Sequence, residues 1–134
     1  MLHIRDAVVG NIQPTENELS LIEDENFQRL RHIKQTGFSS LVYTGANHTR
    51  FEHSLGTMLI TRHMVEQISD EPIEELECVG LLHDIGHAAF SHAADTSLKK
   101  HLKMTHEQVG EEIIRKSSIK DKIQDSTLSF KKII

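Results

Sequence analysis

The sequence predicts an all-α fold, and two observations carry that prediction. Helix-forming Glu, Lys, Leu, Ile and Gln abound, whereas the chain holds only 2 prolines, 5 Phe, 1 Tyr and no Trp. Apolar residues also recur at helical spacing, first between residues 16 and 35. The 134 residues suit a single domain over residues 1–134, which can bury about two-thirds of the surface that its unfolded chain exposes.

The first half of the chain divides into four expected elements. Residues 3–12 have a β-like character that predicts a short strand or hairpin. Residues 16–35 predict helix with a break near residues 23–25, and residues 36–47 contain two glycines and predict a loop. A long helix is expected over residues 48–68.

The second half predicts further helices. Pro72 suits the first turn of a helix that continues to His87. Shorter helices are expected over residues 91–100 and 105–116, and Thr105 with Gln108 has the spacing of a capping box at the start of the second. The last segment, residues 119–134, is compatible with helix but weakly patterned.

Composition and charge argue against several classes of protein. The net charge of −5 argues against a broad nucleic-acid-binding surface. No apolar run approaches the ~18 residues of a membrane span, and the first ten residues do not form a secretory signal, so we expect a soluble, cytoplasmic protein. Cys78, the single cysteine, lies in an apolar stretch and predicts a buried, inert thiol. Phosphate-binding and dinucleotide-binding glycine motifs are absent, which argues against ATP-driven or redox chemistry.

The run His83-Asp84-Ile85-Gly86-His87 concentrates candidate metal ligands. On a helix, His83 and His87 would share one face, and Asp84 would project roughly 100° around the axis. A histidine beside a carboxylate suits a borderline or hard divalent metal. Paired histidines also occur on solvated helix faces, but residues 78–82 are apolar apart from one glycine. Because burial of these polar groups is costly unless they are paired or bind a metal, the sequence predicts a site.

Two other segments supply candidate partners for this run. His53 can complete a ligand set, and Arg50, three residues earlier, offers a planar guanidinium that matches phosphate oxygens. The alternative for Arg50 is an ion pair with Glu52 or Glu66.

A second set of residues suits acid catalysis and anion binding. Asp95 lies three residues after His92 and can orient its ring, which suits a general acid for a phosphate-ester leaving group. His106 lies at the start of an expected helix, where free backbone N–H groups favour anions.

Several segments, in order, resemble the HD-domain phosphohydrolases. More narrowly, they resemble the branch that contains the deoxyguanosine triphosphate triphosphohydrolases and the SAM-and-HD-domain dNTP triphosphohydrolase. The resemblance covers about residues 3–112, and its segments are Arg5–Gly10, Phe27–Gln35, Gly45–Gly56, His83–His92 and Thr105–Gln108.

The resemblance implies an HD-domain helical bundle with one divalent metal ion, among Mn, Fe, Zn, Mg, Ni and Co, held by His53, His83 and Asp84. It also implies that a water activated by the metal attacks the α-phosphorus of a dNTP and releases a deoxynucleoside and triphosphate. The roles implied for the other residues are phosphate contact for Arg50, His87 and His106, catalysis for His92 with Asp95, and proximity to the sugar for Gln35.

The chain departs from the family pattern after His106. The family draws a fourth metal ligand from a later aspartate, but the late aspartates here, Asp121 and Asp125, lie in dissimilar surroundings. We therefore expect a chain shortened at its C-terminal end, whose tail leaves Phe130, Ile133 and Ile134 without a partner.

Three functions remain open on the sequence. The first is dNTP triphosphohydrolysis, and the second is a phosphatase or phosphodiesterase activity on other nucleotides or phosphoesters. The third is a catalytically silent nucleotide-binding or oligomerisation module. Thr36 and the segment Phe38–Ser40 also differ from the branch, which leaves nucleotide preference open. Family members commonly self-associate, so we expect a homo-oligomer.

Overall fold

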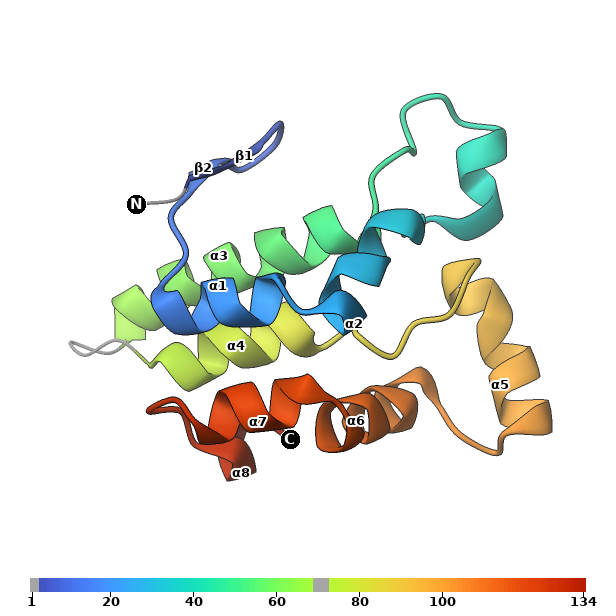
Figure 1. Cartoon of the computed structure of the whole chain (residues 1–134). Helices are drawn as coiled ribbons and strands as arrows, with labels where there is room; N and C mark the ends of the chain where they lie inside the picture. Colours follow the sequence, from blue (N-terminus) through green and yellow to red (C-terminus); the bar gives the residue numbers. More distant parts are fainter. Residues whose placement is uncertain (1–2, 69–72) are drawn as a thin grey trace.

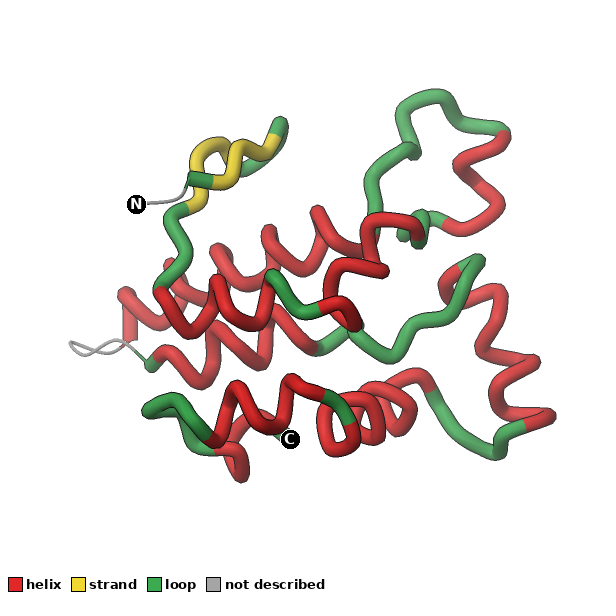
Figure 2. Tube along the Cα trace, in the orientation of Figure 1, coloured by secondary structure: helices red, strands yellow, loops and turns green. Residues whose placement is uncertain are grey.

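A computed structural model describes residues 3–68 and 73–134 and confirms the all-α prediction (Figure 1). Within these residues, Figure 2 shows strand structure only in an antiparallel hairpin, β1 (Ile4–Asp6) and β2 (Gly10–Ile12). Ile4 pairs with Ile12, whose side chain is fully buried, so the hairpin is anchored to the core by its second strand. The strand or hairpin predicted for residues 3–12 is confirmed.

The helices follow in chain order and surround one apolar core. They are α1 (Glu16–Ile22), α2 (Glu25–Gln28), η1 (Arg29–His32), η2 (Gly37–Leu41), α3 (Arg50–Ile68), α4 (Glu74–Leu82), η3 (Ser91–Ala94), α5 (Asp95–His101), α6 (His106–Lys116), α7 (Ser118–Gln124) and α8 (Phe130–Ile133), where η marks 3-10 helices.

The N-terminal helical segment agrees with the prediction except at its end. The break near residues 23–25 is confirmed, because the Asp24 side chain accepts a hydrogen bond from the backbone N–H of Asn26 and caps α2. The prediction that helix continues to residue 35 is wrong. The backbone at Ile33 is extended, and Lys34 forms an antiparallel bridge with Thr49, just before α3. The following predicted loop contains the short helix η2.

Helices α3 and α4 form an antiparallel pair at the centre of the molecule (Figure 1). α3 begins two residues later than predicted, and the predicted start of α4 at Pro72 lies outside the described residues. α4 ends at Leu82, so continuous helix to His87 is wrong. Instead, tight turns follow, in which the N–H of Ile85 donates to the carbonyl of Leu82, and the chain bends toward the start of α6.

The helices after the motif match the prediction closely. The segment 91–100 forms η3 and α5, and the segment 105–116 forms α6. The predicted capping box is present: the backbone N–H of Thr105 donates to Gln108 Oε1 at 2.9 Å, and the N–H of Gln108 donates to Thr105 Oγ1 at 3.4 Å. These bonds fix the first turn of α6, which carries His106.

The C-terminal tail is packed rather than unpartnered. Ile133 on α8 is buried in the core, and Phe130 packs against that core. The expectation that both lack a partner is therefore wrong, because α8 contacts α4 and α7 and covers their apolar side chains. Ile134 remains 37% exposed.

Asp24 links the tail to the N-terminal helices and predicts a pH-dependent stability. Its buried carboxylate accepts hydrogen bonds from Ser118 Oγ at 2.5 Å and pairs with Lys122 Nζ at 3.1 Å. Burial alone would raise the pKa of Asp24, but the hydrogen bonds from Ser118 and Asn26 outweigh it and lower the pKa. Since the folded pKa lies below the unfolded value of about 3.9, this stabilisation is present above that pH and is lost as the pH falls through the folded pKa.

We expect Asp24→Asn to lower the free energy of unfolding at pH 7 by about 2 kcal/mol, since hydrogen bonds to a charged group are replaced by neutral ones. Asparagine still caps α2, so the cap is not what is tested. Urea unfolding at pH 7 and pH 3 measures the difference, which shrinks at the lower pH. The exposed Asp125→Asn is the control, and a difference that does not change with pH would contradict the prediction.

The structure bears on the expectations for Cys78 and for membrane-spanning helices. Cys78 is fully buried and free, and burial raises the pKa of its thiol, as expected for an inert cysteine. Among residues 3–68 and 73–134, we find no helix with the length and apolar character that crossing a bilayer requires.

Candidate metal centre and histidine cluster

His53 on α3 lies beside His83 and Asp84, which belong to the turn that follows α4. Asp84 Oδ2 lies 3.4 Å from His53 Nε2 and 3.1 Å from His83 Nε2. One donor atom from each residue lies within 4.8 Å of the others. Two imidazole nitrogens and one carboxylate oxygen form a mixed donor set that suits a divalent transition metal.

The tautomer of His83 is set by the end of its own helix. His83 Nδ1 lies 2.7 Å from the carbonyl oxygen of Gly80, so this nitrogen carries the proton and donates it. Nε2 is then left on the side of Asp84 and His53, which is the orientation that a metal ligand needs. Burial lowers the pKa of His53, which favours its neutral, ligating form. The residues present therefore fit a divalent metal.

Asp84 remains a carboxylate in this environment. Burial raises the pKa of Asp84, but the adjacent His83 and His87 rings and the hydrogen bond from Arg50 hold that pKa far below its usual range. Arg50 Nη1 lies 2.5 Å from Asp84 Oδ2, and both side chains are buried. An anionic donor is thus maintained next to two imidazoles across the physiological pH range.

Arg50 joins this centre to the segment that carries His92. Its side chain is 3% exposed, and both Nε, at 2.8 Å, and Nη2 donate to the hydroxyl of Ser91. The alternative in which Arg50 pairs with Glu52 or Glu66 is wrong, because the guanidinium points into the core toward Asp84. Ser91 was not singled out by the sequence, and its role depends on a contact 41 residues away.

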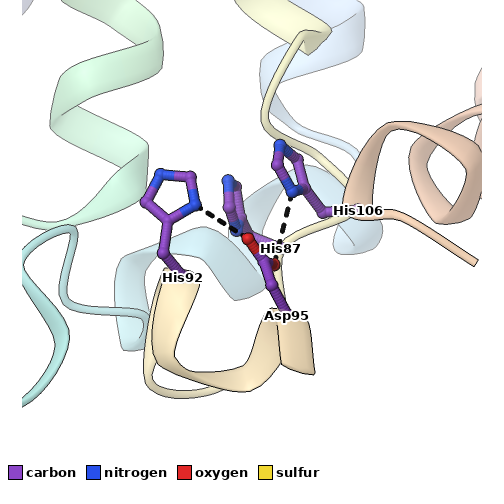
Figure 3. A group of neighbouring side chains, drawn as sticks. All are labelled: His87, His92, Asp95 and His106. Atoms are coloured by element: carbon purple, nitrogen blue, oxygen red, sulfur yellow. Dashed lines mark hydrogen bonds and ion pairs between the residues drawn. The ribbon is translucent and has the colours of Figure 1, made fainter. Parts of the chain in front are cut away.

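A second group consists of His87, His92, Asp95 and His106 (Figure 3). Asp95 lies between two histidines, with Oδ2 3.0 Å from His92 Nδ1 and Oδ1 3.3 Å from His106 Nδ1. The rings of His87 and His106 are stacked, with centroids 4.0 Å apart. Burial raises the pKa of Asp95, but the hydrogen bond from His92 outweighs it and lowers the pKa, so this group is also a carboxylate.

His87 connects the two groups. Its side chain is fully buried, and neither ring nitrogen makes a well-oriented hydrogen bond. Nε2 lies 3.3 Å from Asp84 Oδ1, while the ring packs against His92 and His106. Burial lowers the pKa of His87 and favours the neutral ring. An unsatisfied buried imidazole is costly, which indicates that this position is arranged for a ligand.

The backbone holds these side chains together through close contacts. Arg29 Nη1 donates to the carbonyl oxygen of His87 at 2.7 Å, and Nη2 donates to that of Ile85. Gly86 lies directly against the first turn of α6, where a Cβ on Gly86 would come within 1.9 Å of the His106 carbonyl oxygen. Only glycine permits this approach, which brings His106 beside His87. No pattern in the sequence indicated that Arg29 supports the motif.

The remaining candidates lie outside the two groups. Gln35 lines a cavity of about 360 Å³ with His53 and a second one of about 320 Å³ with His92. Asp121 and Asp125 are exposed and belong to neither group, although both are described residues. Neither one supplies a further ligand to the centre as it stands.

The chain matches known proteins over most of its length. The family model described as "HD domain" matches residues 50–134. Protein MJ1154 of Methanocaldococcus jannaschii is 53% identical over 92 residues, which cover 69% of this chain and 20% of that protein. The deoxynucleoside triphosphate triphosphohydrolase SAMHD1 of Bos taurus is 38% identical over 118 residues, which cover 78% of this chain and 20% of that protein.

A solved structure agrees with the fold. A hypothetical protein from Aquifex aeolicus, known from its crystal structure, superposes with a TM-score of 0.86 and 36% identity over 98% of this chain and 35% of that one. The chain thus spans about a fifth of the two curated relatives named above. The family model matches more than half of the chain, and the matched residues include the histidine–aspartate motif. The chain therefore belongs to the HD-domain family of metal-dependent phosphohydrolases.

Proposed function

We propose that the chain, as one HD domain, hydrolyses deoxynucleoside triphosphates to a deoxynucleoside and inorganic triphosphate. The observation that supports the proposal is the contact between Asp84 and His87. Asp84 belongs to the three-donor metal centre, and His87 belongs to the histidine cluster, so the contact joins the two groups. A centre that neutralises oxygen charge lies next to groups that move protons, which is the arrangement that phosphoester hydrolysis needs. The similarity to SAMHD1 supports dNTPs as the substrate class.

His53, His83 and Asp84 would hold the divalent metal in this proposal. When bound, the metal would act as a Lewis acid that activates water and neutralises charge on the α-phosphate. Arg50 and the Gly80 carbonyl act on the ligands, because they fix the orientation of Asp84 and of His83.

His87 and His106 would receive the phosphates. Their rings are stacked beside the first turn of α6, and the His87 ring, which has no hydrogen-bond partner among the described residues, has an N–H that can donate to a phosphate oxygen. Arg50 is fully engaged with Asp84 and Ser91, so direct phosphate contact requires one of these bonds to be exchanged. We therefore assign Arg50 first to holding Asp84 and second to the substrate.

His92 and Asp95 would form the acid–base pair. The Asp95 carboxylate binds His92 Nδ1–H, which orients the ring and leaves Nε2 for the substrate. The protonated ring, stabilised by Asp95, donates a proton to the oxygen of the departing deoxynucleoside. The His92 side chain is 66% exposed, so it is accessible to a bound substrate.

Incubation with Mn²⁺ and all four dNTPs, followed by anion-exchange separation of the products, tests this function. We expect a deoxynucleoside and triphosphate, lost in the double variant His83→Ala, Asp84→Ala. The exposed His63→Ala is the matched control and retains activity. Release of phosphate or pyrophosphate instead would indicate a different phosphohydrolase. Nucleotide binding without turnover at any metal concentration would favour a silent module and contradict the proposal.

A further inference from the structure

A cavity of about 320 Å³ opens beside His92, between η2 and the segment that leads into η3. Gln35 and the aromatic rings of Phe38 and Phe90 line it together with His92. Of the residues assigned to catalysis or metal binding, His92 alone contributes to this lining. The cavity therefore adjoins the acid–base pair rather than the metal centre.

Two aromatic rings form one wall of the cavity. Phe38 and Phe90 are stacked with centroids 4.5 Å apart and an interplanar angle of 14°. They are nevertheless 55% and 56% exposed, so a paired aromatic surface faces outward. Exposed apolar surface next to polar groups is typical of a ligand-binding site.

The backbone is strained to hold this pair. Phe90 and Ser91 both have left-handed backbones, with φ of 68° and 56°, which costs of order 1 kcal/mol or more for each non-glycine residue. Gly37 has φ of 55°, and a Cβ there would come within 2.7 Å of the Phe90 carbonyl oxygen. The close approach of η2 to Phe90 thus depends on glycine. The same backbone places Ser91 Oγ on the buried Arg50 guanidinium and leaves the Phe90 ring at the cavity.

We infer that the Phe38–Phe90 pair stacks against the base of the substrate nucleotide. This inference rests on the proposed function. Because His92 protonates the oxygen that leaves with the deoxynucleoside, the nucleoside must lie on the His92 side of the scissile bond, and the triphosphate toward His87 and His106. In this orientation, the base of the nucleotide lies in the cavity next to His92.

The chemistry of the pair sets the kind of selectivity. An aromatic surface stacks on any base, since every base has a π-face, and it does not read hydrogen-bonding edges. Phe38 therefore holds purine and pyrimidine bases alike without reading their edges. Gln35, a polar residue of the same lining, can contact the sugar or base edge.

Stopped-flow mixing with 2-aminopurine deoxyribonucleoside triphosphate tests the stacking directly, because stacking quenches 2-aminopurine fluorescence before turnover. We expect quenching by the wild type and by Phe38→Tyr, and its loss in Phe38→Leu, which keeps bulk but removes the π-face. For natural dNTPs, Phe38→Leu should raise KM about tenfold and leave kcat within about twofold. Tyr43→Leu, an exposed aromatic outside the cavity lining, is the matched control with unchanged quenching.

The outcomes separate this inference from the proposed function. Normal dNTP turnover with equal quenching and KM in Phe38→Leu overturns the inference alone. Absence of both nucleotide binding and turnover in the wild type overturns the proposed function and this inference with it. A change of oligomeric state in Phe38→Leu, measured by light scattering with KM unchanged, shows that a second copy covers the pair and also overturns the inference. Far-UV circular dichroism confirms that each variant is folded.

Discussion

The variant Asp84→Ala is expected to lose its divalent metal and to hydrolyse substrate at least about 10²-fold more slowly than the wild type. Asp84 is the anionic member of the donor set, with Oδ2 within 3.4 Å of both His53 Nε2 and His83 Nε2. Two neutral imidazoles remain in the variant, and they hold a hard or borderline cation weakly. The same change also removes the contact with His87 that joins the centre to the histidine cluster.

Asp84→Ala should also destabilise the fold. Arg50 is 3% exposed, and its guanidinium loses the only carboxylate paired with it among the described residues. An unpaired buried cation costs about 3–5 kcal/mol. Asp84→Asn keeps an oxygen that accepts the hydrogen bond from Arg50 while removing the negative charge, so it separates metal loss from fold loss.

Metal content after gel filtration, urea unfolding and dNTP turnover check this prediction. We expect Asp84→Asn to lose metal and activity with a smaller loss of stability than Asp84→Ala. The exposed Asp125→Ala is the control for removing a carboxylate. Full metal occupancy and activity in Asp84→Asn would show that the metal, and the chemistry, lie elsewhere.

Gly86→Ala is expected to destabilise the protein by about 3 kcal/mol, the upper range for an overpacked site. An added Cβ would lie 1.9 Å from the carbonyl oxygen of His106 and 2.3 Å from the backbone nitrogen of Gly110. Both neighbours are backbone atoms of α6, so no side-chain rotation relieves the clash. Either α6 moves away from the motif or the turn after α4 opens.

The movement of α6 has a functional consequence. His106 lies at the first turn of this helix and pairs with Asp95 at 3.3 Å. Its displacement should lower kcat even where the protein remains folded. Gly45→Ala, with no atom within 4 Å of the added Cβ, is the matched control. Thermal unfolding and dNTP turnover measure the two effects, and a Gly86→Ala variant as stable as Gly45→Ala would contradict the packing described for α6.

Local chemistry explains what could be predicted from the sequence. The helical content, the hairpin, the break at Asp24 and the capping box at Thr105 depend on residues two to eight positions apart, which side-chain and backbone hydrogen bonds connect directly. The types of residue in the run from His83 to His92 likewise indicate metal and phosphate chemistry by themselves, and their resemblance to the HD family is confirmed.

Tertiary packing decided how these groups are arranged. Helical periodicity predicted that His83 and His87 share a helix face, but α4 ends at Leu82, and the turn that follows packs Gly86 against α6. The tail, which the sequence left unpartnered, packs on α4 because Ile133 finds apolar surface far away in the chain.

The sequence by itself determined the helical class, the family and the set of chemically competent residues. Only the tertiary structure decided that Arg50 holds Asp84 through a contact 34 residues away, that Asp95 lies between His92 and His106, and that Arg29 and Ser91 support them. The physical reason is that patterns along a chain report hydrogen bonds and faces within one or two helical turns. Contacts between distant segments depend on which buried side chains and glycines let the helices approach, and no local pattern records that.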